Sequence, residues 1–196
     1  MVLSGRGTAS REGVALLIRF EKARVADAEA LTEVQRRTFD DDSNRFGGLS
    51  AGGPPGYDSV DWTLWAIKMG IYYKILAGDR RESRSPGGVG DRRESRSAGG
   101  VGDQIIGGVI LFDMHQRHFN LGRIFVDPDW QDRGIGTQAI QFIEKTFPYV
   151  KRWSLDTPDW AVRNHHFYEK LGYVKVGDEV PTGLPIRLYL YEKSLP

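Results

Sequence analysis

Two glycines spaced by one residue follow a predicted strand and open a predicted helix. The strand covers residues 118–126, a proline follows at 128, and Gly134 and Gly136 begin the helix. N–H groups at a helix start have no intrahelical acceptor and carry the positive end of the helix dipole. Glycine lets an anion approach the backbone, and Arg133 adds a cation beside it. The segment therefore predicts a phosphate or pyrophosphate site.

One interpretation of this segment is a dinucleotide site. Residues 134–139 match the pattern G-x-G-x-x-G/A, and Asp156 lies 22 residues after Gly134, where a ribose-binding acid is expected. In such a site the strand leads almost directly into the first glycine, whereas residues 127–133 intervene here. The earlier strands also lack the repeated strand-helix-strand pattern of that fold. A dinucleotide-binding oxidoreductase is therefore the weaker alternative.

A second interpretation uses more of the sequence. Residues 126–136, Val-Asp-Pro-Asp-Trp-Gln-Asp-Arg-Gly-Ile-Gly, resemble the acetyl-CoA signature of the GNAT superfamily of N-acetyltransferases, which is Gln/Arg-x-x-Gly-x-Gly/Ala after a strand ending in Val-x-Pro. Residues 164–173, Asn-His-His-Phe-Tyr-Glu-Lys-Leu-Gly-Tyr, resemble the second motif of that family. The two motifs have the family's usual separation, and the order of predicted elements agrees from about residue 15 to residue 193. The resemblance implies a GNAT-like fold, acetyl-CoA as cosubstrate and acetyl transfer to a primary amine.

The resemblance also implies roles for individual residues. The turn at residues 131–136 would bind the CoA pyrophosphate, and main-chain groups of the preceding strand would bind the pantetheine arm and the acetyl carbonyl. The backbone N–H of Val126 would stabilise the oxyanion, and one such donor contributes roughly 3–4 kcal/mol in analogous acyl transfers. Tyr168 would lie beside the sulfur and protonate the leaving thiolate. The implied acetyl-CoA contacts are Ile124, Phe125, Val126, Gln131, Asp132, Arg133, Gly134, Ile135, Gly136, Asn164, Tyr168 and Lys170.

The catalytic base is where the sequence departs from the family pattern. Many members carry a glutamate four residues before the position of Ile124, and this chain has Asn120 there, which is a poor proton acceptor. An alkyl amine is mostly protonated at pH 7, so another base or a water chain must remove its proton. Asp113, His118 and Asp156 are available, and Asp156 follows a predicted strand that would place it in the cleft. The candidate catalytic residues are Tyr168, Asp156 and Asn120. The missing glutamate also leaves a non-catalytic CoA-binding module as an alternative.

Cysteine content and charge limit the mechanism and the partners. The chain has no cysteine, so an acetyl-cysteine intermediate is impossible, and direct attack of the amine in a ternary complex is expected. Its 27 basic and 26 acidic residues argue against a dedicated nucleic-acid partner. No apolar run approaches the roughly 20 residues of a membrane span, and no secretory signal is visible. We therefore expect a cytoplasmic protein without a membrane partner, with the oligomeric state open between monomer and homodimer.

The positions of the histidines do not indicate a metal site, whereas a run of aspartates bears on the charge of the acceptor. His115 and His118 do not share a predicted helix, and the adjacent pair at 165 and 166 points apart, so no metal site is expected. Three acids at residues 40–42 lie in a loop predicted over residues 40–57. Near the mouth of a site they would favour a cationic amine, although such a run is more often a solvated helix end. The expected acceptor is an amine-bearing small molecule or peptide.

The predicted elements describe one mixed α/β domain over residues 14–196, preceded by a disordered lead at residues 1–13. Its order is β-α-α-β-β-β-α-β-α-β-β, with a largely antiparallel sheet and one strand-helix-strand crossover at its centre. The predicted strands cover residues 15–21, 71–77, 104–112, 118–126, 153–156, 173–176 and 186–191, and the helices begin near residues 28, 59, 134 and 160.

A tandem duplication interrupts the chain between two of these strands. Residues 78–89 and 90–101 differ only at Pro86 and Ala98, and the 24 residues of the segment 79–102 contain six arginines and four acids. Without this segment the net charge changes from +1 to −1. So polar and glycine-rich a stretch buries too little apolar surface to offset its ordering entropy. It predicts a mobile insertion at the tip of a β-hairpin.

Overall fold

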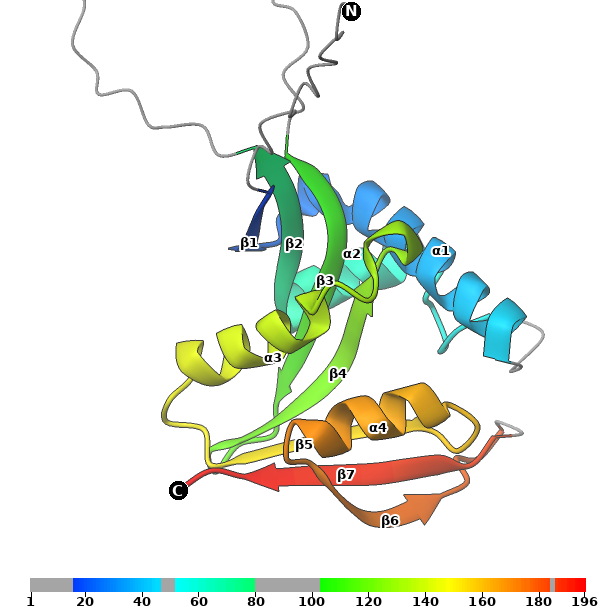
Figure 1. Cartoon of the computed structure of the whole chain (residues 1–196), viewed down its shortest axis with the longest axis vertical. Helices are drawn as coiled ribbons and strands as arrows, with labels where there is room; N and C mark the ends of the chain where they lie inside the picture. The colour runs from blue at the N-terminus through cyan, green and yellow to red at the C-terminus, as the bar shows by residue number, and fades with distance from the viewer. Residues whose placement is uncertain (1–15, 47–51, 80–102, 184–185) are drawn as a thin grey trace, which may run out of the picture.

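The computed structural model describes residues 16–46, 52–79, 103–183 and 186–196 (Figure 1). The lead predicted at residues 1–13 and nearly all of the insertion at 79–102 lie outside these described residues. The helices and strands follow the predicted order, with two added 3₁₀ turns. They are β1 (Leu16–Lys22), η1 (Val25–Asp27), α1 (Ala28–Phe46), α2 (Val60–Met69), β2 (Ile71–Asp79), β3 (Gln104–Asp113), β4 (His118–Val126), η2 (Pro128–Trp130), α3 (Ile135–Thr146), β5 (Arg152–Pro158), α4 (Val162–Lys170), β6 (Val174–Glu179) and β7 (Leu188–Ser194).

One seven-stranded sheet forms the centre of the described structure, in the order β1-β2-β3-β4-β5-β7-β6. Its neighbours are antiparallel except β4 and β5, which are parallel and connected through α3. The predicted mixed α/β fold with a central crossover is therefore confirmed. A dinucleotide-binding unit needs a series of parallel strands, so the dinucleotide interpretation of the glycine turn is wrong.

Helices cover both faces of the sheet (Figure 1). On one face, α1 and α2 bury Leu31, Val34 and Ala66 against β2, β3 and β4. On the other face, α3 and α4 pack against a larger apolar cluster that includes fully buried Trp153. Helix α3 belongs there because its apolar side chains recur every three to four residues, at Ile135, Ala139, Ile140 and Ile143.

Strands β4 and β5 separate soon after they pair. Their ladder contains only three pairs, from His118↔Arg152 to Asn120↔Ser154, and beyond it the two strands diverge (Figure 1). A bulge bends β4 at this point, because the register with β3 passes from Leu121 to Arg123 and leaves Gly122 unpaired. A Cβ on Gly122 would collide with the ring of Phe112, so the bend requires glycine. The separated halves of β4 and β5 leave an opening at the centre of the sheet.

The first long helix extends further than the sequence predicted. We expected a loop from residue 40, but α1 continues to Phe46. Ion pairs one helical turn apart stabilise the extension, with Arg45 Nε 3.1 Å from Asp41 Oδ1. The acids at 40–42 are therefore helical, and Asp42 lies next to the opening between β4 and β5.

The predicted hairpin is present in the described part of the chain. Strands β2 and β3 pair antiparallel up to Ala77↔Gln104, so the insertion lies between two paired strands. None of the described helices has both the length and the apolar character to cross a bilayer.

Candidate active site

The turn between β4 and α3 is held by local capping contacts. Asp127 caps η2 by accepting a hydrogen bond from the N–H of Asp129 at 3.0 Å, and Pro128 occupies the first position of η2. Gln131 then reaches back and donates to the carbonyl of Val126 at 3.0 Å. The chain therefore returns to the end of β4 before α3 starts.

The start of α3 presents free N–H groups to open space. Gly134 is the N-cap residue and has a left-handed backbone with φ of 73°. A Cβ at this position would have no heavy atom of the described residues within 4 Å. The first helical hydrogen bond runs from the N–H of Gln138 to the carbonyl of Gly134 at 3.0 Å, so the N–H groups at 135–137 precede it. This geometry fits an anionic group.

A cavity of about 320 Å³, the first cavity, lies against this turn. It is enclosed by α1, the end of β4, the turn, the first turn of α3 and one face of α4. All of the implied acetyl-CoA contacts except Arg133 and Lys170 line it. Its lining residues are Thr38, Phe39, Asp42, Ile124, Phe125, Val126, Trp130, Gln131, Asp132, Gly134, Ile135, Gly136, Thr137, Arg163, Asn164, Phe167 and Tyr168.

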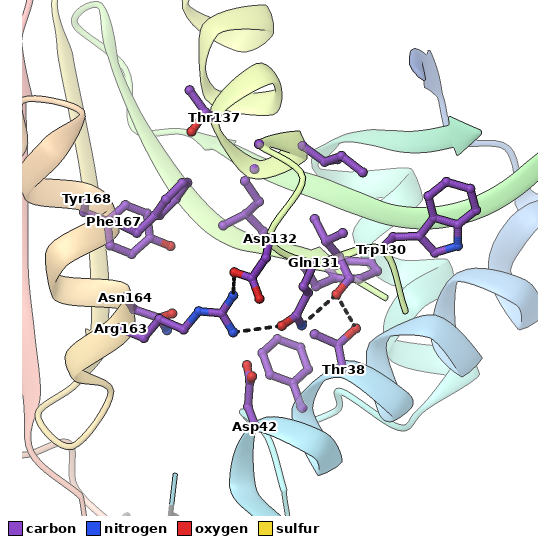
Figure 2. Close-up of a pocket in the computed structure, with 17 residues that line it drawn as sticks. Thr38, Asp42, Trp130, Gln131, Asp132, Thr137, Arg163, Asn164, Phe167 and Tyr168 are labelled. Carbon is purple, nitrogen blue, oxygen red and sulfur yellow. Dashed lines mark hydrogen bonds and ion pairs between the residues drawn. The ribbon is translucent and has the colours of Figure 1, made fainter. Parts of the chain in front are cut away.

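Arg163 bridges α4 to the turn across the mouth of the first cavity. Its guanidinium donates to Gln131 Oε1 at 3.0 Å and forms an ion pair with Asp132. Figure 2 shows Arg163 reaching from α4 towards these two side chains, with Asp42 of α1 on the other side. The arginine neutralises the one carboxylate of the turn that lines the cavity, which makes the site more favourable for an anion.

The end of β4 presents main-chain groups to the opening. The N–H of Asp127 donates to the carbonyl of Ile106 on β3 at 2.8 Å, so the N–H groups of Val126 and Ile124 point to the opposite side. On that side β5 has already diverged. The carbonyl of Val126 is held by Gln131 and by Thr38 Oγ1 at 3.3 Å. The strand edge thus offers N–H donors where the sequence predicted an oxyanion contact.

Tyr168 lies where two cavities meet. The residue is only 7% exposed, and no hydrogen bond joins its hydroxyl to another of the described residues. The pKa of Tyr168 is raised well above its usual value by burial and by the nearby Asp156 carboxylate. The phenol therefore keeps its proton across the neutral range and can act as a proton donor.

The second cavity, about 400 Å³, adjoins the first on the β5 side. The two share six lining residues: Phe39, Asp42, Ile124, Arg163, Asn164 and Tyr168. Asp156 and Arg123 line the second cavity only, together with apolar groups such as Leu121, Trp160 and Leu188. A reacting pair held in the two cavities would meet beside Tyr168.

Two carboxyl groups border the second cavity and have raised pKa values. Burial raises the pKa of Asp156, and Glu179 adds a smaller repulsion. Burial also raises the pKa of Asp42, partly offset by Arg163. A carboxylate whose pKa is shifted towards neutrality is a stronger base than an ordinary one.

The remaining predicted residues lie outside both cavities. Asn120 belongs to the last pair of the β4–β5 ladder and donates to Ser154 Oγ at 3.2 Å, so it stabilises the junction of these two strands. Arg133 is exposed and donates to the carbonyl of Asp129 at 3.0 Å. Lys170 is exposed at the end of α4.

Neither of the other two candidate bases lines a cavity among the described residues. His118 is held by Ser154 Oγ at 2.8 Å and by Arg152 at 2.9 Å, and burial and Arg152 lower its pKa. Asp113 accepts a hydrogen bond from the N–H of His115 at 2.7 Å in a turn. In the described part of the chain no three histidine, aspartate or glutamate side chains gather in a way that could hold a metal ion.

Sequence reasoning missed three residues of the site, Thr38, Arg163 and Arg123, and it placed Asp42 in a loop where the structure has a helix. Arg163 directly precedes the second motif, and its separation from Gln131 by a whole strand hides the contact. Arg123 was missed because strict alternation along β4 places it on the same face as Leu121. The bulge at Gly122 instead turns Arg123 towards α1 and α2.

Comparison with known proteins agrees with this geometry. Residues 97–175 match the family model described as the acetyltransferase (GNAT) domain. This part of the chain is therefore similar to GNAT acetyltransferase domains. Two proteins of Bacillus subtilis (strain 168) are similar to part of this chain. They are the uncharacterized protein YrkN, 32% identical over 68 residues, and S-(2-succino)cysteine N-acetyltransferase, 34% identical over 61 residues.

These sequence matches are partial, whereas the fold match covers nearly the whole domain. The aligned stretches span 34% and 28% of this chain and 37% and 35% of the two relatives. The PaiA N-acetyltransferase of Thermoplasma acidophilum, solved in complex with coenzyme A, superposes with a TM-score of 0.65 and 17% identity. That superposition covers 91% of this chain and 99% of the neighbour. The predicted GNAT-like fold is confirmed.

Proposed function

We propose that this chain transfers the acetyl group of acetyl-CoA to a primary amine by direct attack in a ternary complex. The observation that carries the proposal is the pair of adjoining cavities. One ends on the free N–H groups of α3, and the other is bordered by carboxylates. They meet at Tyr168, Asn164 and Ile124, so two substrates would meet there. The GNAT domain and the CoA-bound structural neighbour agree with this assignment.

The residues of the first cavity fit the cosubstrate. A pyrophosphate needs N–H donors and room for its oxygens, and the start of α3 offers both beside Gly134. The Arg163 bridge reduces repulsion from Asp132. Asn164, held by a 3.3 Å hydrogen bond to Thr157 Oγ1, leaves its amide oxygen for the amide-rich pantetheine arm.

The proposed chemistry uses three residues that line the two cavities. Acetyl-CoA supplies a thioester whose carbon–sulfur bond breaks as the amine nitrogen bonds to the acetyl carbon. Asp156 accepts the proton that the amine must lose, and its raised pKa suits that role. The N–H of Val126 stabilises the negative charge on the carbonyl oxygen. Tyr168 donates its proton to the departing thiolate.

The acceptor is a primary amine that enters through the second cavity. Asp42 and Asp156 favour a cationic group on approach, and the apolar walls favour a carbon skeleton of modest size. Among the relatives, one is named for N-acetylation of S-(2-succino)cysteine. A small amine is therefore the first class of acceptor to test.

The test is thiol release from acetyl-CoA across a panel of primary amines. Since the chain has no cysteine, every thiol detected comes from CoA. We expect saturable release that depends on the amine and gives the acetylated amine by mass spectrometry. When both substrates are varied, the double-reciprocal lines of the initial rates should intersect, as a ternary complex requires.

Two results would overturn parts of the proposal. Saturable acetyl-CoA binding without turnover on any amine would favour the non-catalytic module suggested by Asn120. Parallel initial-rate lines together with an acetylated form of the enzyme would replace direct attack by a two-step mechanism.

A further inference from the structure

We propose that the acceptor carries a carboxylate as well as its amine, and that Arg123 in the second cavity binds that carboxylate. The acceptor class is then a small amino carboxylate with an apolar body. The inference rests on the proposed function, because it names the substrate of the same site.

Arg123 is a buried cation without an anionic partner. Only 8% of the residue is exposed. Its Nη1 donates to Gln35 Oε1 at 2.9 Å and its Nη2 to the carbonyl of Pro55 at 2.6 Å, and both acceptors are neutral. No carboxylate of the described residues forms an ion pair with it. Burial of an unpaired charge is costly, and buried charges in proteins are normally paired.

The surroundings of Arg123 hold the guanidinium in place without neutralising it. The guanidinium carbon lies 3.5 Å from the centre of the Trp62 ring, which gives a cation–π contact. Burial lowers the pKa of Arg123 only to about 10, so the side chain stays charged at neutral pH. The cavity therefore keeps a full positive charge on its wall.

A buried network fixes the orientation of the arginine. Gln35 is fully buried and donates its amide to Thr63 Oγ1 at 3.2 Å and to Tyr72 Oη at 3.3 Å. Its amide oxygen is therefore left to accept from Arg123. Two of the five guanidinium N–H groups are used by these neutral partners, and the rest remain for a planar anion such as a carboxylate.

The second cavity provides opposite charges on different strands. Arg123 comes from β4, and Asp156 comes from the diverging part of β5. Leu121, Trp160 and Leu188 line the same cavity with apolar surface. An amino carboxylate would match this distribution, with its amine directed towards Asp156 and Tyr168 and its carboxylate towards Arg123. An amine without a negative group would leave the arginine unpaired.

The experiment compares acids with their amides. Leucine is compared with leucinamide, and phenylalanine with phenylalaninamide. The kcat/KM of each of the four acceptors is measured. We expect the parent to prefer the acid at least tenfold, because the amide lacks the charge that pairs with Arg123. In Arg123→Gln the acid-to-amide ratio should fall towards one, and in Arg123→Lys part of the preference should remain. Acetyl-CoA affinity should change little in either.

Arg117→Gln is the matched control, because Arg117 is exposed near the opposite end of β4. It should keep the ratio of the parent. An equal or greater rate with the amides in the parent, or an unchanged ratio in Arg123→Gln, overturns the inference. The parent measurement decides even if Arg123→Gln does not fold.

The failure of this inference can be told apart from that of the proposed function. If no amine is acetylated, the proposed function fails, and leucine binding is then measured by calorimetry in the presence of CoA. Binding of leucine but not leucinamide, lost in Arg123→Gln, would still support carboxylate recognition by Arg123. Equal binding of both, or binding of neither, would contradict it.

Discussion

At the scale of single residues, the proposed reaction depends on an acid and a base with shifted pKa values. Burial raises the cost of ionising Tyr168, and the Asp156 carboxylate lies close enough to the phenol to raise it further. Tyr168 therefore stays protonated, whereas Asp156 ionises at a higher pH than an ordinary aspartate.

Tyr168→Phe removes the proton donor and should lower kcat by about 10²-fold. The affinity for acetyl-CoA should stay within a few-fold, since the ring is retained. Thiol-release kinetics and calorimetry measure the two quantities. Tyr173→Phe is the matched control, because Tyr173 is also buried, and its hydroxyl has no partner among the described residues. A kcat for Tyr168→Phe equal to that of this control would remove Tyr168 from the mechanism.

Asp156→Asn should lower kcat/KM by about 10²-fold and change the pH profile. In the parent, activity should rise with pH as Asp156 ionises through its raised pKa, and the variant should lack this limb. A raised pKa means that the folded protein binds the proton more tightly than the unfolded chain, so ionisation destabilises the fold.

The same variant should therefore be slightly more stable than the parent at pH 7. The gain should disappear below about pH 4, where the aspartate is protonated even in the unfolded chain. Thermal unfolding at both pH values measures this difference. A variant with the activity and pH profile of the parent would show that another group or a water chain removes the proton.

At the scale of elements, the bend in β4 and the turn into α3 create the site. Gly122 allows β4 to leave β5, and the capped turn brings the start of α3 to the end of β4. The bridge from Arg163 to the turn fixes α4 against it.

Arg163→Ala should weaken acetyl-CoA binding several-fold, because Asp132 would be left unpaired beside the bound anion. The fold should lose less than about 1 kcal/mol, since both side chains of the pair are exposed. Addition of Asp132→Asn should restore most of the affinity. Arg187→Ala, which breaks a comparably exposed pair with Asp178 away from the first cavity, should leave the affinity unchanged. Failure of Asp132→Asn to restore binding would argue that Arg163 contacts the ligand directly.

Sequence patterns predicted the order of elements well because each signal was local. The glycines at 134 and 136, the amphipathic period of α3 and the strand over residues 118–126 need only neighbouring residues to be recognised. The end of α1 was missed because helical ion pairs outweighed the aspartate-rich composition. Arg123 and Arg163 were missed because a bulge and a long-range contact determine where they point, and neither leaves a periodic signal.

At the scale of the whole molecule, the strand ends that flank the insertion in sequence and the site belong to different parts of the sheet. The described ends of β2 and β3 lie at the end of the molecule away from β5 and α4 (Figure 1). Loop closure entropy also changes slowly with length.

Deletion of residues 90–101, one of the two repeated units, should therefore change the free energy of unfolding by less than about 1 kcal/mol. Thiol release should continue at the rate of the parent. Urea unfolding and the kinetic assay measure these effects. A folded deletion variant that has lost turnover would mean that the repeated units contribute to the site.

The most direct test of the central claim is calorimetric titration of acetyl-CoA into the parent, Gly134→Glu and Gly183→Glu. Gly183 also has a positive φ, of 84°, and open surroundings, but it lies outside both cavities, so it controls for backbone strain. We predict that the parent and Gly183→Glu bind acetyl-CoA alike, and that Gly134→Glu binds at least tenfold more weakly because its carboxylate occupies the anion position. Equal affinity in all three proteins would contradict the assignment of the α3 turn as the acetyl-CoA site.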